Sequence, residues 1–338
     1  MGAKYVKRSL IAVGLLVAAI GTAQAQKLTG AGATFPYPIY SKWFSQYSSA
    51  HPGVEVNYAS IGSGGGIAQV TKGLVDFGAS DMPMTDDMLS SSPVKLIHIP
   101  TVLGAVVPVF NVPGVTALRF SPDVLADIYL GKISNWNDAR IAKDNPDAKL
   151  PDQKIIVVHR SDGSGTSFIW TDYLSKVSKD WAGGPGKGTA LSWPTGVGGK
   201  GNDGIAGLVR QMPGAIGYVE LIYALQNKIT FGSVKNSAGN WITASIQGVT
   251  EAAASVKNMP ADYRVSITNA PGANAYPISS FTYLLIPKSG GDKSKRTVLK
   301  DLVSWMLKSG EEQASALSYA PLPQSLVDQE LKTVYAIQ

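Results

Sequence analysis

The residues best suited to chemistry are hydroxyl side chains set in three glycine-rich stretches. Thr34 lies in "GAGATFPYPIY", Ser63 in "SIGSGGGIAQV", and Ser164 and Thr166 in "HRSDGSGTSFIW". Each stretch leads into a helix-like segment, and a helix start presents unpaired backbone N–H groups and a partial positive charge. Small residues there let an anion approach the backbone closely. A single Gly/Ser cluster is more often a plain turn, but three of them predict an anion-binding site.

Charged residues near these stretches restrict the kind of anion that the site could bind. Arg160 precedes Ser164, and Asp162 stands two residues after the arginine. A guanidinium can bind an oxyanion through two parallel hydrogen bonds while a carboxylate holds it in place, although a purely structural salt bridge explains the pair equally well. Asp81, in "VDFGASDMP", would repel an anion unless the ligand donates a proton to it. Asp81 therefore favours an oxyanion that still carries a proton.

The elements that must position these residues alternate along the chain. Strand-like segments such as "VEVNYASIG", "AVVPVFNV", "KIIVVHR", "AIGYVE" and "FTYLLIP" are separated by helix-like segments. This alternation predicts an α/β fold. In the first stretch, apolar spacing predicts a helix that begins near Thr34, with Thr34 as N-cap and Pro36 and Pro38 in the first turn. A glycine-dense region, "WAGGPGKGTALSWPTGVGGKGNDG", is interpreted as a functional or packing loop.

The first 25 residues have the pattern of a cleavable secretory signal peptide. A basic start precedes an apolar run over residues 10–20 and an A-x-A motif at residues 23–25. A transmembrane anchor is less favoured, because the run is shorter than the roughly 20 residues that a bilayer span needs. We expect cleavage before Gln26. The loss of three basic residues would lower the formal net charge from +6 to +3.

Several function classes fit this composition poorly. The chain has no cysteine, and its three histidines lie far apart with no carboxylate at ligand spacing, so we expect no metal site and no cofactor. The charges are scattered rather than clustered, which disfavours a nucleic-acid partner. A G-x-G-x-x-G match at residues 196–201 follows Trp193-Pro194 rather than a strand and is interpreted as accidental. Neither Ser63 nor Ser164 lies in a G-x-S-x-G nucleophile motif.

The quoted motifs, in their order, resemble a known family. "GAGATFPYPIYSKW", "IGSGGGIAQV", "VDFGASDMPM", "IYLGKISNW", "RSDGSGTSFIW", "WPTGVGGKGNDGIAGLV" and "PGAIGYVE" are similar to the periplasmic phosphate-binding proteins of the high-affinity phosphate ABC importer, the PstS family. The resemblance implies a type II periplasmic-binding fold, with two α/β lobes joined by a hinge and a ligand cleft between them. It places lobe I at residues 26–100 and 282–338 and lobe II at 101–281, with hinge crossings near 97–107 and 276–281.

The same resemblance implies which residues contact phosphate. Phe35 would contribute its backbone N–H, and Asp162 would pair with the arginine. Gly64 departs from the family pattern, which has a second serine there, and His159 and Ser161 replace an arginine and an alanine beside Arg160. The implied phosphate-binding residues are Thr34, Phe35, Ser63, Asp81, Arg160, Asp162, Ser164, Gly165 and Thr166.

The expected function is therefore capture of inorganic phosphate in the periplasm and delivery to the membrane permease subunits of an ABC importer. The resemblance implies a monomeric binding protein that is not an enzyme. Two alternatives remain: an exported phosphohydrolase, and a binder of another tetrahedral oxyanion. Asp81 argues against sulfate, because sulfate has no proton to donate to a carboxylate. An additional role in surface adhesion or signalling stays open.

Overall fold

The computed structural model describes residues 26–337. The predicted signal peptide, residues 1–25, lies outside this range, so its prediction stays untested. Within the described range, no helix combines the length and the apolar character needed to cross a membrane.

The chain forms a mixed nine-stranded sheet flanked by helices, which confirms the predicted α/β class. Neighbouring strands follow the order β2, β1, β3, β12, β4, β8, β6, β7, and β9 pairs with β4. These strands are β1 Gln26–Gly32, β2 Val54–Ser60, β3 Phe77–Ser80, β4 Leu96–Asn111, β6 Ile156–Arg160, β7 Val197–Gly199, β8 Ala215–Glu220, β9 Thr230–Phe231 and β12 Ser279–Pro287.

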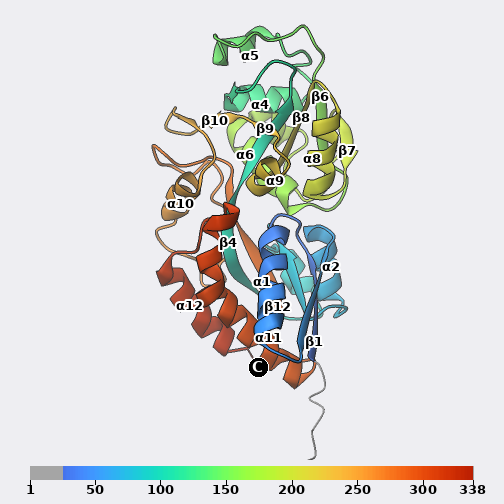
Figure 1. Cartoon of the computed structure of the whole chain (residues 1–338), viewed down its shortest axis with the longest axis vertical. Helices are drawn as coiled ribbons and strands as arrows, with labels where there is room; N and C mark the ends of the chain where they lie inside the picture. The colour runs from blue at the N-terminus through green and yellow to red at the C-terminus, as the bar shows by residue number, and fades with distance from the viewer. Residues whose placement is uncertain (1–25, 338) are drawn as a thin grey trace, which may run out of the picture.

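The long strand β4 joins two parts of the molecule (Figure 1). Up to Ala105 it pairs with β12, and from Val106 it pairs with β8. We call the part around β1, β2, β3 and β12 the β1 half, and the part around β6, β7 and β8 the β6 half. The lobe boundaries given in the sequence analysis remain a prediction.

Helices cover both halves of the sheet (Figure 1). In α1, the apolar residues Ile39, Trp43 and Tyr47 follow helical spacing and are buried, so one face of this helix enters the core of the β1 half. The helices are α1 Tyr37–Ala50, α2 Ser63–Thr71, α3 Asp86–Ser91, α4 Pro122–Tyr129, α5 Ala139–Asp144, α6 Gly165–Val177, α7 Lys179–Gly183, α8 Gly201–Gln211, α9 Leu221–Gln226, α10 Ile246–Ala254, α11 Lys293–Trp305 and α12 Gln324–Tyr335.

Smaller elements complete the chain. A three-stranded sheet joins β11 Trp241–Ile242, β10 Ser233–Lys235 and β5 Arg119–Phe120 in that order. Between α11 and α12 the chain makes three short helical turns, η1 Met306–Gly310, η2 Glu311–Gln313 and η3 Ser315–Leu317.

Each half has its own aromatic core. In the β1 half, Tyr40 packs edge-on against Tyr58, with ring centroids 5.7 Å apart. In the β6 half, Trp170 of α6 stacks on Tyr218 of β8 at 5.1 Å. These contacts fix α1 and α6 against their strands, and both helices follow glycine-rich stretches singled out in the sequence.

Two local expectations were wrong. The helix expected from Thr34 begins at Tyr37, and its N-cap is Pro36, with no side-chain cap. Thr34 cannot serve as the cap because its hydroxyl accepts hydrogen bonds from Asn202 instead. The glycine-dense region is also more than a loop, because it contains β7, which pairs in parallel with β6, and the start of α8. The G-x-G-x-x-G match therefore does span a strand-to-helix turn.

Candidate functional site

The predicted site residues follow the carboxyl ends of parallel strands. In the β1 half, β1 pairs in parallel with β2 and β3, and these three strands lead into Thr34, Ser63 and Asp81 respectively. In the β6 half, β6 ends at Arg160 and leads into α6. Crevices beyond the carboxyl ends of strands are where open α/β sheets bind ligands, and this explains why residues far apart in sequence meet here.

In the β1 half, Ser63 and Asp81 are in direct contact. The Asp81 backbone N–H donates to Ser63 Oγ at 3.2 Å, and Ser63 Oγ lies 3.5 Å from Asp81 Oδ2. Thr282 of β12 donates to the other carboxyl oxygen, Oδ1, at 2.7 Å. Both Ser63 and Asp81 are buried, with 0% and 1% of their surface exposed.

Burial changes the protonation of Asp81. It raises the pKa of the carboxyl to about 7, while the hydrogen bond from Thr282, the charge of Arg160 and the hydrogen bond from Ser63 oppose the rise. Asp81 is therefore poised to hold or accept a proton near neutral pH, which an ordinary exposed aspartate does not do.

In the β6 half, Arg160 is held from both sides. Its Nε and Nη2 donate to the two carboxyl oxygens of Asp162 at 2.7 and 2.5 Å, which is the bidentate geometry of a strong ion pair. Its backbone N–H donates to the Tyr218 hydroxyl at 3.1 Å. The third nitrogen, Nη1, lies 3.4 Å from Thr166 Oγ1. The guanidinium is thus fixed at the start of α6.

The start of α6 is built as expected for an anion site. Ser164 is the N-cap, and its Oγ accepts from the Ser167 N–H at 3.0 Å, which leaves its own hydroxyl hydrogen to donate elsewhere. Gly165 is required by close approach, because a Cβ there would clash with Ser63 Oγ and with Asp81. Ser164 and Thr166 are both buried.

The two halves touch each other across this site. The Gly64 N–H donates to the Gly163 carbonyl at 2.8 Å, joining the loop before α6 to α2. The Cα of Gly163 lies only 3.1 Å from where a Cβ on Gly64 would be, so a larger residue at Gly64 would require the Gly163 loop to shift by a few tenths of an ångström. Gly64 therefore permits this close contact.

The loop of Thr34 and Phe35 is fixed through its carbonyl groups. Tyr223 of α9 donates to the Thr34 carbonyl, and Tyr319 donates to the Phe35 carbonyl, both at 2.6 Å. These bonds orient the peptide units of the loop, including the Phe35 N–H that the sequence analysis assigned to ligand binding. Thus the nine predicted residues lie on adjoining loops: Thr34, Phe35, Ser63 and Asp81 come from the β1 half and the other five from the β6 half.

Asn202 and Glu220 also belong to this cluster of residues, although neither was predicted from the sequence. Asn202 bonds to Thr34 and Thr166, and the Glu220 N–H donates to Asn202 Oδ1 at 2.9 Å. Burial raises the pKa of the Glu220 carboxyl well above its ordinary value. A signal for Asn202 was present, because "VGGKGND" is a fourth stretch that joins a strand to a helix through glycines.

Two of the three histidines, His98 and His159, make structural contacts. His98 is buried and its Nε2 accepts from the Met84 N–H at 3.0 Å, and burial lowers the pKa of its ring to about 4. His159 stacks on Trp193 with ring centroids 4.9 Å apart. In residues 26–337, no group of three or more His, Cys, Asp or Glu side chains could hold a metal ion.

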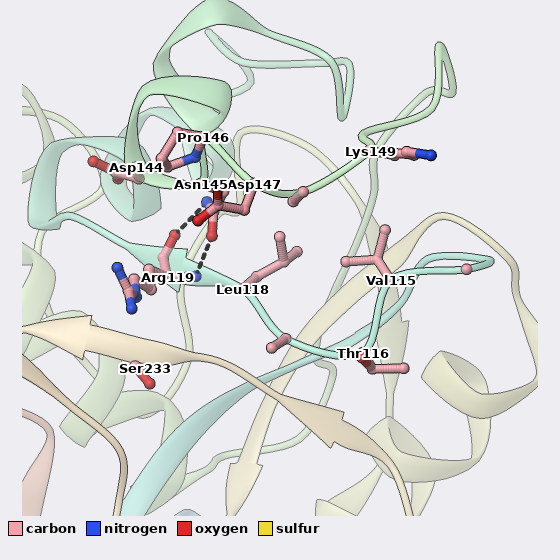
Figure 2. A pocket seen from close by; sticks show the side chains of 13 residues that line it. Val115, Thr116, Leu118, Arg119, Asp144, Asn145, Pro146, Asp147, Lys149 and Ser233 are labelled. Atoms are coloured by element: carbon pink, nitrogen blue, oxygen red, sulfur yellow. Dashed lines mark hydrogen bonds between the residues drawn. The ribbon is translucent and has the colours of Figure 1, made fainter.

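A separate surface pocket of about 620 Å³ lies in the β6 half beside α5 (Figure 2). None of the predicted phosphate-binding residues lines it. Asn145 accepts from the Arg119 N–H at 2.7 Å and donates to the Arg119 carbonyl at 2.9 Å, so its side chain blocks the free edge of β5. The charged side chains around it have both signs, which does not favour one anionic or cationic ligand.

Comparison with known proteins identifies the family. A model described as "PBP superfamily domain" matches residues 17–310. The chain is 47% identical over 306 residues to the phosphate-binding protein PstS of Xylella fastidiosa strain Temecula1, covering 90% of this chain and 83% of that protein. It is 45% identical over 324 residues to PstS of Pasteurella multocida strain Pm70, covering 95% and 93%. The chain belongs to the PstS family of phosphate-binding proteins.

Solved structures agree with this family fold. A high-affinity periplasmic phosphate-binding protein, determined with phosphate bound, superposes with a TM-score of 0.72 at 21% identity and covers 90% of this chain and 92% of that one. This similarity confirms the predicted periplasmic-binding-protein fold. Membership of the PstS family also makes the chain a binding protein rather than an enzyme, as the sequence analysis expected.

Proposed function

We propose that the chain captures one inorganic phosphate ion where its β1 and β6 halves meet, and delivers it to the membrane permease subunits of a phosphate ABC importer. The proposed ligand contacts are hydroxyl groups, backbone N–H groups at helix starts, the Arg160 guanidinium and one carboxyl group. They belong to Thr34, Phe35, Ser63, Asp81, Arg160, Ser164, Gly165 and Thr166, with Asp162 holding the arginine.

The observation that carries the proposal is the position of Asp81 among hydrogen-bond donors. The other side chains of the proposed site donate hydrogens, which suits any oxyanion. Asp81 lies within 3.5 Å of Ser63 Oγ, and when its carboxyl is ionised both oxygens can only accept, so the proton of a hydrogen bond between ligand and carboxylate must come from the ligand. Phosphate at neutral pH carries at least one proton, whereas sulfate carries none. The site therefore favours phosphate.

The test is calorimetry on protein first stripped of bound ligand by unfolding, washing and refolding. We expect saturable one-to-one binding of sodium phosphate and no measurable binding of sodium sulfate. No binding of phosphate by the refolded protein would overturn the proposal. Equal binding of both anions would support a general tetrahedral-oxyanion binder and would remove Asp81 as the discriminating group.

We also propose that residues 1–25 direct export, that the chain acts as a periplasmic monomer, and that it is cleaved before Gln26. The basic start, apolar run and A-x-A motif support this interpretation. Expression in a Gram-negative host should give a periplasmic product whose intact mass corresponds to residues 26–338. A charged residue in place of Ala25 should block cleavage. A full-length product in the cytoplasmic fraction of the parent would contradict the proposal.

A further inference from the structure

Asn202 lies where the two halves meet, outside the residues to which the family resemblance assigns phosphate contacts. It is the second residue of α8, directly after the short strand β7, and none of its surface is exposed. Gly201 before it has a φ of +71°, a left-handed conformation that glycine adopts readily. This turn directs the chain from β7 into α8 and places Asn202 between the Thr34 loop and the start of α6.

The Asn202 side chain donates both amide hydrogens to threonine hydroxyls of the proposed phosphate site. Its Nδ2 lies 2.8 Å from Thr34 Oγ1 and 3.1 Å from Thr166 Oγ1. The Asn202 backbone N–H also donates to Thr34 Oγ1 at 3.3 Å, and Arg160 Nη1 donates to Thr166 Oγ1 at 3.4 Å. Each hydroxyl oxygen thus accepts from two N–H groups.

These contacts determine what the hydroxyl groups can still do. A threonine hydroxyl has one hydrogen to donate and two lone pairs with which to accept. When two N–H groups occupy both lone pairs, the remaining interaction that Thr34 or Thr166 can offer a ligand is donation of its hydrogen. An anion requires such donors, whereas a freely rotating hydroxyl spends part of its time with its lone pairs towards the ligand.

The orientation of the Asn202 amide is itself fixed. Its Oδ1 accepts the Glu220 backbone N–H at 2.9 Å. A flipped amide would set its NH₂ group against that N–H and its oxygen against the two hydroxyls, so the hydrogen-bond network selects one orientation. Glu220 ends β8, which pairs with β6 and β4, so the amide is anchored to the central sheet.

We infer that Asn202 is a positioning residue that fixes Thr34 and Thr166 as hydrogen-bond donors towards the anion. This inference rests on the proposed phosphate function. It explains why the threonine hydroxyls of the site act as hydrogen-bond donors. Because Thr34 belongs to the β1 half and Thr166 to the β6 half, the same amide also links the two halves directly when they are together.

The test is a double-mutant cycle in phosphate affinity. Asn202→Ala should weaken phosphate binding about tenfold. Each threonine hydroxyl is then no longer held as a donor towards the ligand, and a hydrogen bond is typically worth about a factor of ten in affinity. In a Thr34→Val, Thr166→Val background, the same Asn202→Ala change should alter affinity by no more than about twofold, since no hydroxyl remains to be oriented. A residue that only supports the fold would cause the same loss in both backgrounds.

A second variant tests the direction of donation. Asn202→Asp keeps the shape and the oxygen that accepts from Glu220, but replaces the NH₂ donor by an acceptor. The threonine hydroxyls should then turn towards the new carboxylate, and phosphate affinity should fall by about a hundredfold or more. Asn137→Asp, at an exposed position in the β6 half, adds the same charge elsewhere and should leave affinity unchanged.

The outcomes separate this inference from the proposed function. A parent protein that binds no phosphate would overturn both. A parent that binds phosphate, with unchanged affinity in Asn202→Ala and Asn202→Asp or with equal losses in the two backgrounds, would overturn the role of Asn202 alone. Circular dichroism and thermal unfolding establish that each variant is folded. If Asn202→Ala is not, Asn202→Ser, whose short side chain cannot reach both hydroxyls, takes its place in the cycle.

Discussion

Two carboxyl groups of the proposed anion site, Asp81 in the β1 half and Asp162 in the β6 half, have pKa values shifted in opposite directions. Burial on its own would raise the pKa of both carboxyl groups. At Asp162, however, the hydrogen bonds and charge of Arg160 outweigh burial and hold the pKa below its ordinary value. At Asp81 no cation forms a hydrogen bond with the carboxyl, and the pKa rises to about 7.

The difference explains how the proposed site could contain acidic groups and still bind an anion. Asp162 stays ionised and its charge is neutralised by Arg160, so it acts as a fixed support for the guanidinium. Asp81 has hydroxyl partners, Thr282 and Ser63, rather than a cation. A carboxyl group in such surroundings is stabilised by a shared proton, which a protonated ligand can supply.

Removing Arg160 should have the largest effect on phosphate binding. Arg160→Ala deletes the cation and leaves Asp162 as an unpaired, partly buried charge, so both halves of the site would then repel an anion. Phosphate binding should weaken by about 2–5 kcal/mol, the usual cost of truncating one member of a desolvated charge pair. Calorimetry measures this loss, and Arg210→Ala, at an exposed position of α8, is the matched control. Unchanged affinity would place Arg160 outside the site.

Much of this arrangement could be predicted from the sequence, because its signals are local. Glycines and hydroxyls at helix starts identified Ser63 and Ser164, and the spacing of Arg160 and Asp162 suggested their ion pair. The same kind of signal was present in "VGGKGND" before Asn202, but the contacts that Asn202 makes could not be predicted from it. Its partners Thr34 and Thr166 lie 168 and 36 residues away, and only the packing of the two halves brings them together. The predicted N-cap role of Thr34 is wrong for the same reason, because the contact between the Thr34 hydroxyl and Asn202 also arises from the packing of the two halves.

The pH dependence of stability should distinguish the two carboxyl groups directly. In the ligand-free protein, the raised pKa of Asp81 lies above the unfolded value of about 3.8. Asp81 therefore makes its full contribution to the free energy of unfolding below pH 4, where it is protonated, and this contribution is lost as the pH rises through 7. The loss should reach about 4 kcal/mol relative to Asp81→Asn. Asp162 has a lowered pKa, so its contribution is present above pH 4 and is lost as the pH falls further.

Urea unfolding of the stripped parent and of Asp81→Asn between pH 4 and pH 8 measures the first effect. The difference in unfolding free energy between the two proteins should grow in favour of the variant across this range. A difference that is independent of pH would show that Asp81 does not titrate near neutrality. Asp162→Asn measured in parallel should show no such rise between pH 5 and pH 8.

Loss of single hydroxyl groups beside Arg160 should have smaller effects. Thr166→Ala and Ser164→Ala each remove one donor while the backbone N–H groups of α6 remain, so phosphate binding should weaken by about 1–3 kcal/mol each. Thr166→Ser keeps the hydroxyl and should stay near the parent affinity in the same titration. If neither alanine variant differs from the parent, the anion does not lie at the start of α6.

The smallest expected change concerns the selectivity of the site for phosphate over sulfate. Asp81→Asn keeps the size of the side chain and the oxygen that accepts from Thr282, but removes the negative charge and adds an NH₂ donor. Phosphate, which can interact with either side chain, should bind nearly as before. Sulfate should gain about tenfold in affinity, roughly 1.4 kcal/mol, because its contact with an unprotonated carboxylate is gone. Titration of stripped parent and variant with sodium sulfate measures this gain. Equal sulfate affinity in the parent and in Asp81→Asn would mean that Asp81 does not select against sulfate. The distinction between Asp162 as the support of Arg160 and Asp81 as the selective group would then be wrong.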